Sequence, residues 1–123
     1  MVASHLQRGV AAEVLAAEYL RMQGLKLVAR NLRCKAGEID IVCLDHEVLV
    51  IVEVRQRGGP DFGGALASVT RRKQRKLIRA TQFQWQRQPG WRARVLRFDV
   101  IALQARPDGG QELTWIKDAF RAG

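Results

Sequence analysis

The amino-acid sequence predicts an α/β fold, a mixed central sheet flanked by helices, with its elements in the order αβββαββ. Two observations carry this prediction. Segments with a helical spacing of apolar residues alternate with short β-branched runs. The 123 residues, of which 47% are hydrophobic and 27% charged, suit one globular domain over residues 1–123. This composition excludes wholesale disorder and fibrous repeats.

The expected helices cover residues 5–23, where Gly24 is placed to cap the C-terminal end, and residues 69–86. Strands are expected over residues 25–30, 38–44, 48–54, 94–103 and 113–117. Residues 57–64 hold four glycines and Pro60, which predicts a loop. Because this loop lacks the Gly-Lys-Ser/Thr ending of a phosphate-binding P-loop, we exclude nucleotide binding there.

The positive charge is concentrated in one part of the chain. Lys and Arg number 21 against 12 Asp and Glu, a net charge of +9, and residues 71–97 hold ten of the bases and no acid. Such a block favours a polyanion as the partner. The candidate nucleic-acid-binding residues are Arg57, Arg71, Arg72, Lys73, Arg75, Lys76 and Arg79. Trp85 and Trp91 lie in the same block, either to stack on bases or to pack in the core, and both readings stay open.

The sequence also argues against several classes of protein. No run of 18 uncharged apolar residues occurs, so we expect neither secretion nor a membrane span. The two cysteines, Cys34 and Cys43, do not form a Cys-x-x-Cys pair, and both histidines are isolated from them. We therefore expect reduced thiols in a cytoplasmic protein without a structural zinc site.

Two acidic residues fall inside runs that otherwise predict buried strands. Asp40 lies in the strand over residues 38–44, where alternation places it opposite the face of Ile39 and Ile41, and Glu53 lies in the next strand. If His46 and Glu47 form a two-residue turn, antiparallel pairing sets residue i opposite residue 93 − i. Asp40 then faces Glu53 directly, and a shift of one residue would separate them.

A third acid, Glu13, is the single charge on the apolar seam of the first helix, which holds Leu6, Val10, Ala17 and Leu20. Carboxylates that face one another repel unless a cation lies between them, and hard oxygen ligands suit Mg²⁺ or Mn²⁺. Beside a basic surface, such a site suits phosphodiester hydrolysis. The alternative, equally open on spacing alone, is that Asp40 and Glu53 form buried ion pairs with Arg55, Arg57 or Lys35.

Glu38-Ile39-Asp40, followed by Val52-Glu53-Val54-Arg55, resembles the motif of the restriction-endonuclease-like nucleases, an Asp and then Glu-x-Lys on the next strand. More narrowly, the chain is similar to the YraN-like family of uncharacterised bacterial proteins (uncharacterised protein family 0102), which is grouped with Holliday-junction-resolvase-like folds. The resemblance extends over nearly the whole chain. Further matching segments are Ala12-Glu13, Arg30-Asn31, Arg72-Lys73-Gln74, Arg97-Phe98-Asp99-Val100 and Asp118-Ala119-Phe120.

The resemblance implies a restriction-endonuclease-like fold and a set of site residues. Asp40 and Glu53 would ligate the metal together with the Val54 carbonyl, and Glu13 would be an outer or additional acid ligand. Glu13, Asp40, Glu53 and Arg55 would form the catalytic group. The resemblance also implies a homodimer as the working unit.

One position departs from the superfamily motif, because Arg55 stands where it has a lysine. A guanidinium neutralises a phosphate but does not readily release its proton to act as a base. Lys73 is the candidate to replace that lysine, since it lies on the helix line of Val69, Leu77 and Ala80 that should face the sheet; otherwise it extends to solvent.

Two functions follow from these residues. The first is a Mg²⁺- or Mn²⁺-dependent endonuclease that acts on DNA, structured or branched. The second is a DNA-binding protein of the same fold that has lost cleavage, for which Arg55 is the argument. A ribosome-associated RNA-binding factor ranks below both, because it has no use for converging acids. We expect Asp99 to be structural and to pair with a nearby arginine.

Overall fold

The computed structural model describes residues 5–57 and 68–122, and side chains from residues 11–56 and 68–122. Its elements are α1 (His5–Met22), β1 (Lys26–Cys34), β2 (Gly37–Asp45), β3 (Val48–Arg57), α3 (Arg71–Arg87), the 3₁₀ turn η1 (Pro89–Trp91), β4 (Val95–Ala105) and β5 (Gln111–Phe120). The predicted order αβββαββ is confirmed. Most of the predicted loop at 57–64 lies outside the described residues, as do the side chains of Leu6, Val10 and Arg57.

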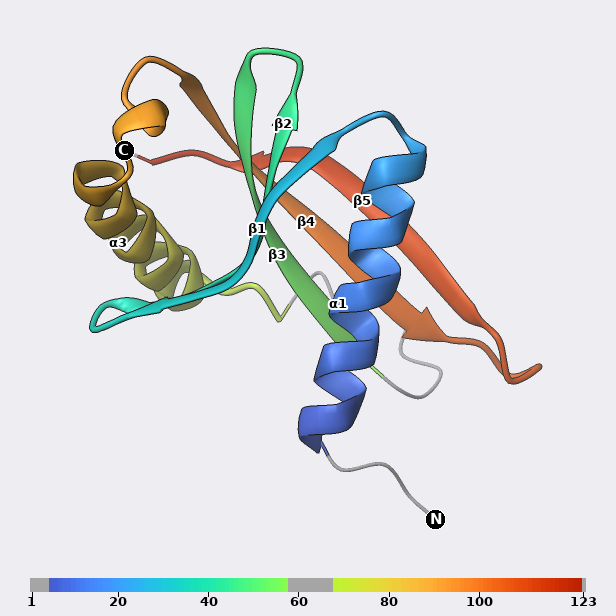
Figure 1. Cartoon of the computed structure of the whole chain (residues 1–123). Coiled ribbons are helices and arrows are strands. Elements are labelled where there is room, and N and C mark those ends of the chain that lie inside the picture. The colour runs from blue at the N-terminus through green and yellow to red at the C-terminus, as the bar shows by residue number, and fades with distance from the viewer. Residues whose placement is uncertain (1–4, 58–67, 123) are drawn as a thin grey trace.

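The five strands form one mixed sheet in the order β1-β2-β3-β4-β5, in which β3 and β4 are parallel and all other neighbours are antiparallel. Helices α1 and α3 cover opposite faces of this sheet (Figure 1). A parallel pair needs a crossover connection, and α3 lies in the one between β3 and β4. The α/β class is confirmed and agrees with the restriction-endonuclease-like arrangement that the motifs implied.

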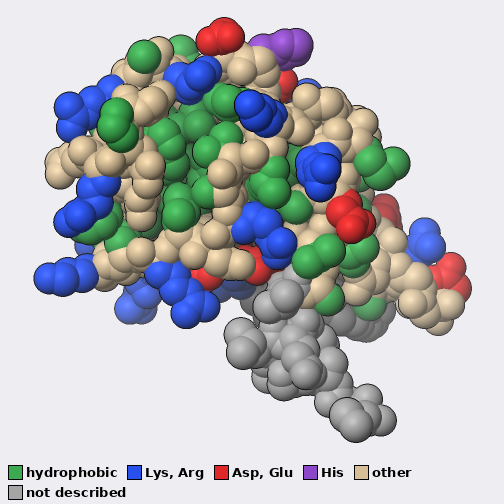
Figure 2. All heavy atoms as spheres, viewed as in Figure 1, with side chains coloured by type: hydrophobic (Ala, Val, Ile, Leu, Met, Phe, Trp, Pro, Cys, Tyr) green, Lys and Arg blue, Asp and Glu red, His purple; other side chains and the backbone are tan. Residues whose placement is uncertain are grey.

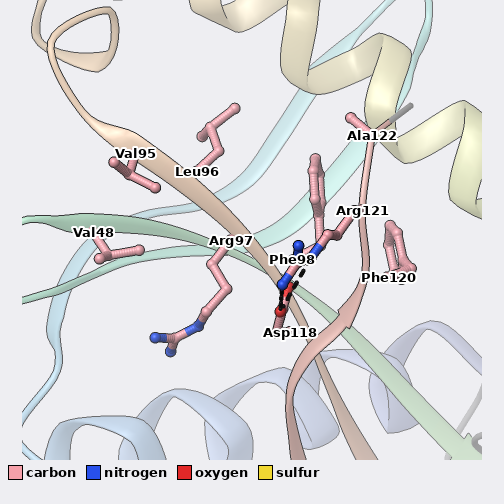
Figure 3. Close-up of a pocket in the computed structure, with 9 residues that line it drawn as sticks. All are labelled: Val48, Val95, Leu96, Arg97, Phe98, Asp118, Phe120, Arg121 and Ala122. Atoms are coloured by element: carbon pink, nitrogen blue, oxygen red, sulfur yellow. Dashed lines mark hydrogen bonds and ion pairs between the residues drawn. The ribbon is translucent and has the colours of Figure 1, made fainter.

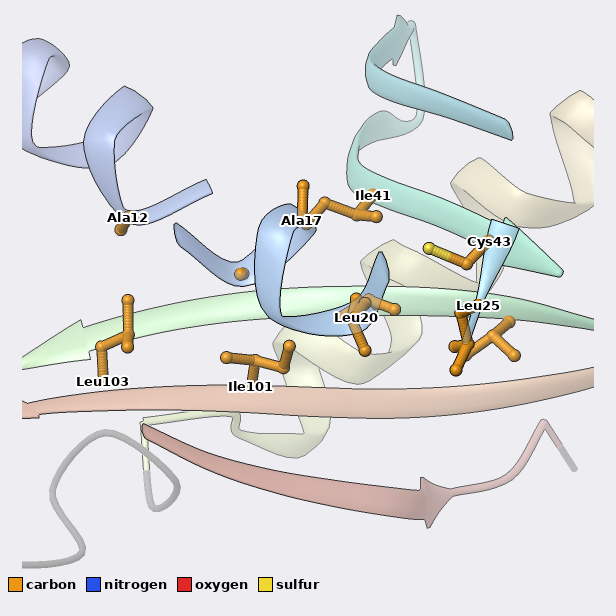
Figure 4. Close-up of a cluster of buried hydrophobic side chains, with 11 residues drawn as sticks. Ala12, Ala17, Leu20, Leu25, Ile41, Cys43, Ile101 and Leu103 are labelled. Carbon is orange, nitrogen blue, oxygen red and sulfur yellow. The ribbon is translucent and has the colours of Figure 1, made fainter. Parts of the chain in front are cut away.

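Each face of the sheet has its own core. On the α1 side, the helix presents a face of mostly small side chains to the sheet, formed by Ala12, Ala16, Ala17 and Leu20. This face packs on Ile41, Cys43, Val50, Val52, Ile101 and Leu103 (Figure 4). On the α3 side, Leu77 and Ala80 pack with Ile39, Val42, Leu49, Ile51, Trp91 and Phe98. The alternation of Leu49, Val50, Ile51 and Val52 between the two cores explains why β3 reads as a continuous apolar run.

The register of β2 and β3 follows the predicted rule, because Ile41 pairs with Val52 and Asp45 with Val48 around the turn at His46 and Glu47. The ladder ends at Ile41, one residue before Asp40. One prediction was wrong. Ile39 belongs to the α3-side core and Ile41 to the α1-side core, so these two residues do not share a face.

The physical reason is a break in the regular pleat at the end of that ladder. Opposite Asp40, Asn31 of β1 has a left-handed backbone with φ of 54°, which an extended strand residue does not adopt. Beyond this point the β1–β2 hairpin leaves β3 and curls towards α3 (Figure 1). Asp40 therefore lies where β2 separates from the body of the sheet.

Both cysteines are free, and burial raises the pKa of the Cys43 thiol to about 12. Trp91 is buried in the α3-side core, so the packing interpretation holds for it, whereas Trp85 is half-buried at the edge of that core. Among the described residues, no helix combines the length and apolarity needed to cross a membrane.

Candidate functional site

Asp40 sits at the separation of β2 from β3, and its carboxylate oxygen Oδ2 accepts a hydrogen bond of 2.9 Å from the backbone N–H of Val54. The side chain thus takes the place that the next ladder bond would occupy. Burial raises the pKa of Asp40, and the Val54 N–H opposes that shift by stabilising the ionised form. The strand break therefore holds a half-buried carboxylate in a fixed position on the backbone of β3.

Two other acids converge on Asp40. Carboxylate oxygens of Glu13 from α1, Glu38 from β2 and Asp40 lie within 4.8 Å of one another. The pKa of Glu13 is raised to about 7, first by burial and then by the charges of Asp40 and Glu38. Glu38 is exposed to solvent, so this group of three acids is open on one side. We refer to Glu13, Glu38 and Asp40 as the acid cluster.

Asn31 completes the edge of the acid cluster. With its side-chain nitrogen turned towards the carboxylates, it donates to both oxygens of Glu13 at 2.8 and 3.0 Å and to Glu38 at 3.1 Å. This orientation of the amide follows from the hydrogen-bond network. The left-handed backbone of Asn31 thus occurs at a residue type that tolerates it and whose side chain contacts the site.

Glu53 adjoins the acid cluster from the α3 side, since it follows Leu49 and Ile51 in the alternation of β3. Its pKa is raised to about 8, first by burial and then by the charge of Asp40. The predicted direct pairing of Asp40 with Glu53 is not part of the β2–β3 ladder, which ends at Ile41 and Val52. Arg55 and Lys73 oppose this shift, and the Arg55 Nη1 atom lies 3.6 Å from Glu53 Oε1. Lys73 therefore lies near the site, although its residue is largely exposed.

The Arg55 guanidinium is held from two sides, because its Nε also donates to Ser68 Oγ at 2.9 Å. The ion-pair alternative predicted from spacing therefore applies to Glu53 and Arg55 at a loose 3.6 Å. It does not remove the crowding of acids around Asp40, because the charge of Arg55 lowers the pKa of Asp40 less than burial and Glu38 raise it. Glu53 can therefore pair loosely with Arg55 and still leave the described acids around Asp40 with more negative charge than Arg55 neutralises.

Helix α3 starts beside this site and carries an unusual charge pattern. Its first turn holds no acid and three bases, Arg71, Arg72 and Lys73, although the N-terminal end of a helix favours negative charge. Thr70 caps this end by accepting a hydrogen bond of 3.3 Å from the Lys73 N–H. Like charges also face each other one turn apart, at Arg71 and Arg75, Arg72 and Lys76, and Arg75 and Arg79. All six basic residues of this segment are exposed.

Asp99 provides a contrast within the same sheet. This fully buried carboxylate accepts hydrogen bonds of 2.9 Å from Arg97 Nε and Nη2, of 3.0 Å from Trp115 Nε1 and of 2.9 Å from the Asp118 N–H. The predicted structural pairing with an arginine is confirmed. The end of β5 also contacts β4 through its side chains, since Phe120 stacks on Phe98 with ring centroids 5.1 Å apart.

The residues predicted from sequence thus lie together, with Glu13, Asp40, Glu53, Arg55 and Lys73 around the end of the β2–β3 ladder. Sequence reasoning missed Glu38 and Asn31 as members of the site. Asn31 directly follows the strand predicted over residues 25–30, and Asn is one of the few residue types that accept a left-handed backbone, which was the available signal for the break.

Sequence comparison agrees with these features. A profile of the uncharacterised protein family UPF0102 matches residues 12–103, which include every residue of the site. A UPF0102 protein of Pseudomonas putida (strain GB-1) is 50% identical over 118 residues, which cover 96% of each chain. A UPF0102 protein of Pseudomonas entomophila (strain L48) is 52% identical over 112 residues, which cover 91% of each chain. This chain therefore belongs to the uncharacterised protein family UPF0102, as its motifs predicted.

Proposed function

We propose that this protein is a metal-dependent nuclease that hydrolyses phosphodiester bonds in DNA. The observation that carries the proposal is the convergence of Glu13, Glu38 and Asp40, with Glu53 adjoining, beside the basic first turn of α3. Neither feature favours folding by itself, because acids meet acids and bases meet bases. A divalent cation would relieve the first repulsion, and a phosphate backbone would relieve the second.

The donor set fits Mg²⁺ or Mn²⁺, which prefer carboxylate and carbonyl oxygens. Asp40 and Glu53 are the proposed ligands, with the Val54 carbonyl and with Glu13 and Glu38 as additional acids. The N–H and C=O of one residue in an antiparallel strand point to the same side, so the hydrogen bond from Val54 to Asp40 supports a carbonyl facing the same place. When bound, the metal would polarise the scissile phosphodiester and lower the pKa of a water ligand.

The chain's own cations would bind and orient the phosphate. Arg55 is fixed by Glu53 and Ser68, which suits a guanidinium that neutralises the charge of a phosphate at the site. Lys73 lies near Glu53 and supplies a second positive charge from α3. The exposed Arg72 and Lys76 continue this positive surface along the helix and would hold the neighbouring backbone of the DNA.

Calorimetric titration with Mn²⁺ tests the proposed metal site. The wild type should bind, and Asp40→Ala and Glu53→Ala should each abolish binding. Glu18→Ala is the matched control, because Glu18 lies on the same helix as Glu13 but is exposed, and it should leave binding unchanged. Binding that persists in both strand variants would remove the metal site and the nuclease with it.

A cleavage assay tests the reaction. Labelled linear and four-way-junction DNA are incubated with the protein and Mg²⁺, and the same variants are compared with an EDTA control. Products should depend on Mg²⁺ and on Asp40. A wild type that binds Mn²⁺ and DNA and yet forms no product would contradict the enzymatic proposal.

The second candidate function is a DNA-binding protein of this fold without cleavage, and Arg55 is the observation that favours it. A permanently protonated guanidinium at this position cannot serve as a base. Arg55→Lys separates the two functions. A sharp gain in cleavage would show that this residue alone limits an otherwise competent site, whereas activity already present in the wild type and lost in Lys73→Met would assign the lysine role to α3.

A further inference from the structure

Helix α3 leaves part of its side of the sheet uncovered. The helix packs on β1 and β2, and beyond it a groove runs between α3, β4 and the C-terminal residues. Three adjoining cavities of about 560, 440 and 430 Å³ make up this groove, and each of the residues Ile78, Leu96, Phe98, Arg121 and Ala122 lines two of them. On the face drawn in Figure 2, apolar side chains lie in a hollow with basic side chains around it. The three cavities form one groove beside the helix. We call it the α3 groove.

The floor of the α3 groove is apolar and partly aromatic. Phe98 and Phe120 stack with an interplanar angle of 20°, and both line the cavity drawn in Figure 3. Half-buried Trp85 of α3 lines the adjoining cavity together with Ile78. At the rim, Val95 is 70% exposed. The floor thus presents aromatic and aliphatic surfaces, and the polar side chains of Gln82 and Gln86 lie beside Trp85.

The rim of the groove on the helix side is a row of arginines. Arg71, Arg75 and Arg79 follow one another at four-residue intervals, so successive guanidinium groups start about 6 Å apart along the helix axis. Within the described part of the chain, none of these three arginines has a hydrogen bond or an ion pair. Asp118, the carboxylate among the described lining residues, is already bound by Arg121 at 2.8 Å. As far as the described residues go, the helix side of the groove therefore carries positive charge that no acid compensates.

We infer that the α3 groove binds an unpaired strand of nucleic acid, with its phosphates on Arg71, Arg75 and Arg79 and its bases on the apolar floor. A basic edge beside stacking surfaces is the arrangement that single strands require. A duplex keeps its bases stacked inside and has nothing to place on the floor. A second copy of the chain, at a net charge of +9, would bring arginines against arginines.

This inference rests on the proposed function for the kind of ligand and adds the form of the substrate. Arg71 is the first residue of α3 and lies two positions before Lys73, which interacts with Glu53. A strand in the groove would therefore lead towards the acid cluster. The substrate class that follows is DNA in which a duplex adjoins an unpaired strand.

Binding to two oligonucleotides tests the inference. Fluorescence anisotropy is measured in EDTA, so that nothing is cleaved, with an oligothymidylate about 20 nucleotides long and with a duplex of similar length. In Arg75→Gln/Arg79→Gln the affinity for the single strand should fall roughly tenfold, and its salt slope should fall by about 0.7 for each arginine. The affinity for the duplex should change by less than about twofold.

The matched control is Arg21→Gln/Lys26→Gln, which removes the same charge from exposed positions at the junction of α1 and β1. It should affect both ligands little and equally. A second variant, Trp85→Leu, keeps an apolar side chain but removes a stacking surface, and it should weaken single-strand binding roughly fivefold. Circular dichroism confirms that each variant is folded.

Three results would overturn the inference in different ways. Equal losses for single strand and duplex would make the groove arginines ordinary duplex contacts and leave the proposed function intact. Unchanged binding of both ligands would overturn the groove as a nucleic-acid site and favour an acidic amphipathic peptide as its occupant. Absence of binding by the wild type to either oligonucleotide would remove the proposed function as well.

Discussion

Asp99 of β4 and Asp40 of β2 are both withdrawn from water, and their surroundings are opposite. Asp99 accepts four hydrogen bonds, two of them from Arg97, and every one of its donors belongs to β4 or β5. Asp40 accepts one backbone hydrogen bond from Val54 and a side-chain hydrogen bond from Glu13, and it otherwise faces the acids Glu38 and Glu53. Burial alone therefore does not distinguish the two regions.

The difference shows that the Asp99 carboxylate stabilises the folded state, whereas the Asp40 carboxylate destabilises it when ionised. A buried charge whose acceptor positions are filled locks its strand pair together, whereas converging carboxylates raise one another's pKa and destabilise the ionised site. Local conflicts of this kind tend to mark functional positions. The five predictions below test this distinction, from the largest expected effect to the smallest.

Asp99→Ala should be the most damaging of these changes, with a loss of about 3–5 kcal/mol in the free energy of unfolding. The reason is that Arg97, whose side chain is only 18% exposed, would keep its charge without its main partner. Asp45, at 3.0 Å from Arg97 Nη1, would compensate only in part. Urea unfolding monitored by circular dichroism measures the loss.

Asp40→Ala in the absence of metal is the direct comparison. It should cost far less than Asp99→Ala, because the loss of the hydrogen bonds from Val54 and Glu13 is offset by relief of the repulsion from Glu38 and Glu53. Equal losses in the free energy of unfolding for the two variants would show that both acids stabilise the fold, which would contradict the proposed difference between them.

The stability of the metal-free protein should fall as the pH rises from about 4.5 to about 8. The pKa values of Glu13 and Glu53 are raised in the folded state to about 7 and about 8, from 4.5. Between these limits the folded state binds more protons than the unfolded chain, so these two groups lose their stabilising effect with increasing pH. For the buried Glu53 we expect roughly 2 kcal/mol across this window, after allowance for solvent screening.

Chemical unfolding of the wild type and of Glu13→Gln/Glu53→Gln at successive pH values isolates this effect, because other groups titrate in both proteins. The difference in the free energy of unfolding between the wild type and this variant should shrink as the pH is lowered towards 4.5. Added Mg²⁺ should reverse the fall in the wild type alone, since the ion binds the ionised carboxylates. A pH-independent difference would contradict the proposed protonation of the site.

Asn31 gives a smaller test that is confined to the acid cluster. Asn31→Ala should lower the metal-free stability by about 1–2 kcal/mol, because alanine loses the amide donor and also resists a φ of 54°. Asn31→Gly removes the same donor but accepts that backbone, so the difference between the two variants measures the backbone contribution. If glycine proves as costly as alanine, the left-handed conformation is not what selects asparagine here.

The sequence was sufficient for the parts of the fold that follow regular geometry. The turn at His46 and Glu47 determined the β2–β3 register, and the spacing of Arg97 and Asp99 put both on one face of a strand. The bend at Asn31 was not predictable from alternation, since alternation assumes the extended conformation that this residue leaves. Ile39 was consequently assigned to the wrong face, and Glu38 was not recognised as a neighbour of Glu13.

The α3 groove could not be predicted from the sequence either. Its lining combines residues of the helix, of β4 and of the chain end, for example Ile78, Leu96 and Arg121, which only the tertiary structure brings together. The basic block itself was evident from composition. Which arginines share a side of the helix with an open apolar surface depends on how far α3 covers the sheet.

The smallest expected effect concerns Trp115, which supplies one of the four hydrogen bonds to Asp99 at 3.0 Å. Trp115→Phe should cost about 1 kcal/mol, because the carboxylate keeps its other three donors and a phenyl ring can retain the edge contact with Tyr19. A double-mutant cycle with Asp99→Asn assigns that cost, since most of it should vanish once the carboxylate charge is gone. Additive losses would place the contribution of Trp115 in packing instead. The hydrogen bonds to Asp99 would then contribute less to the free energy of unfolding than the proposed difference between Asp99 and Asp40 assumes.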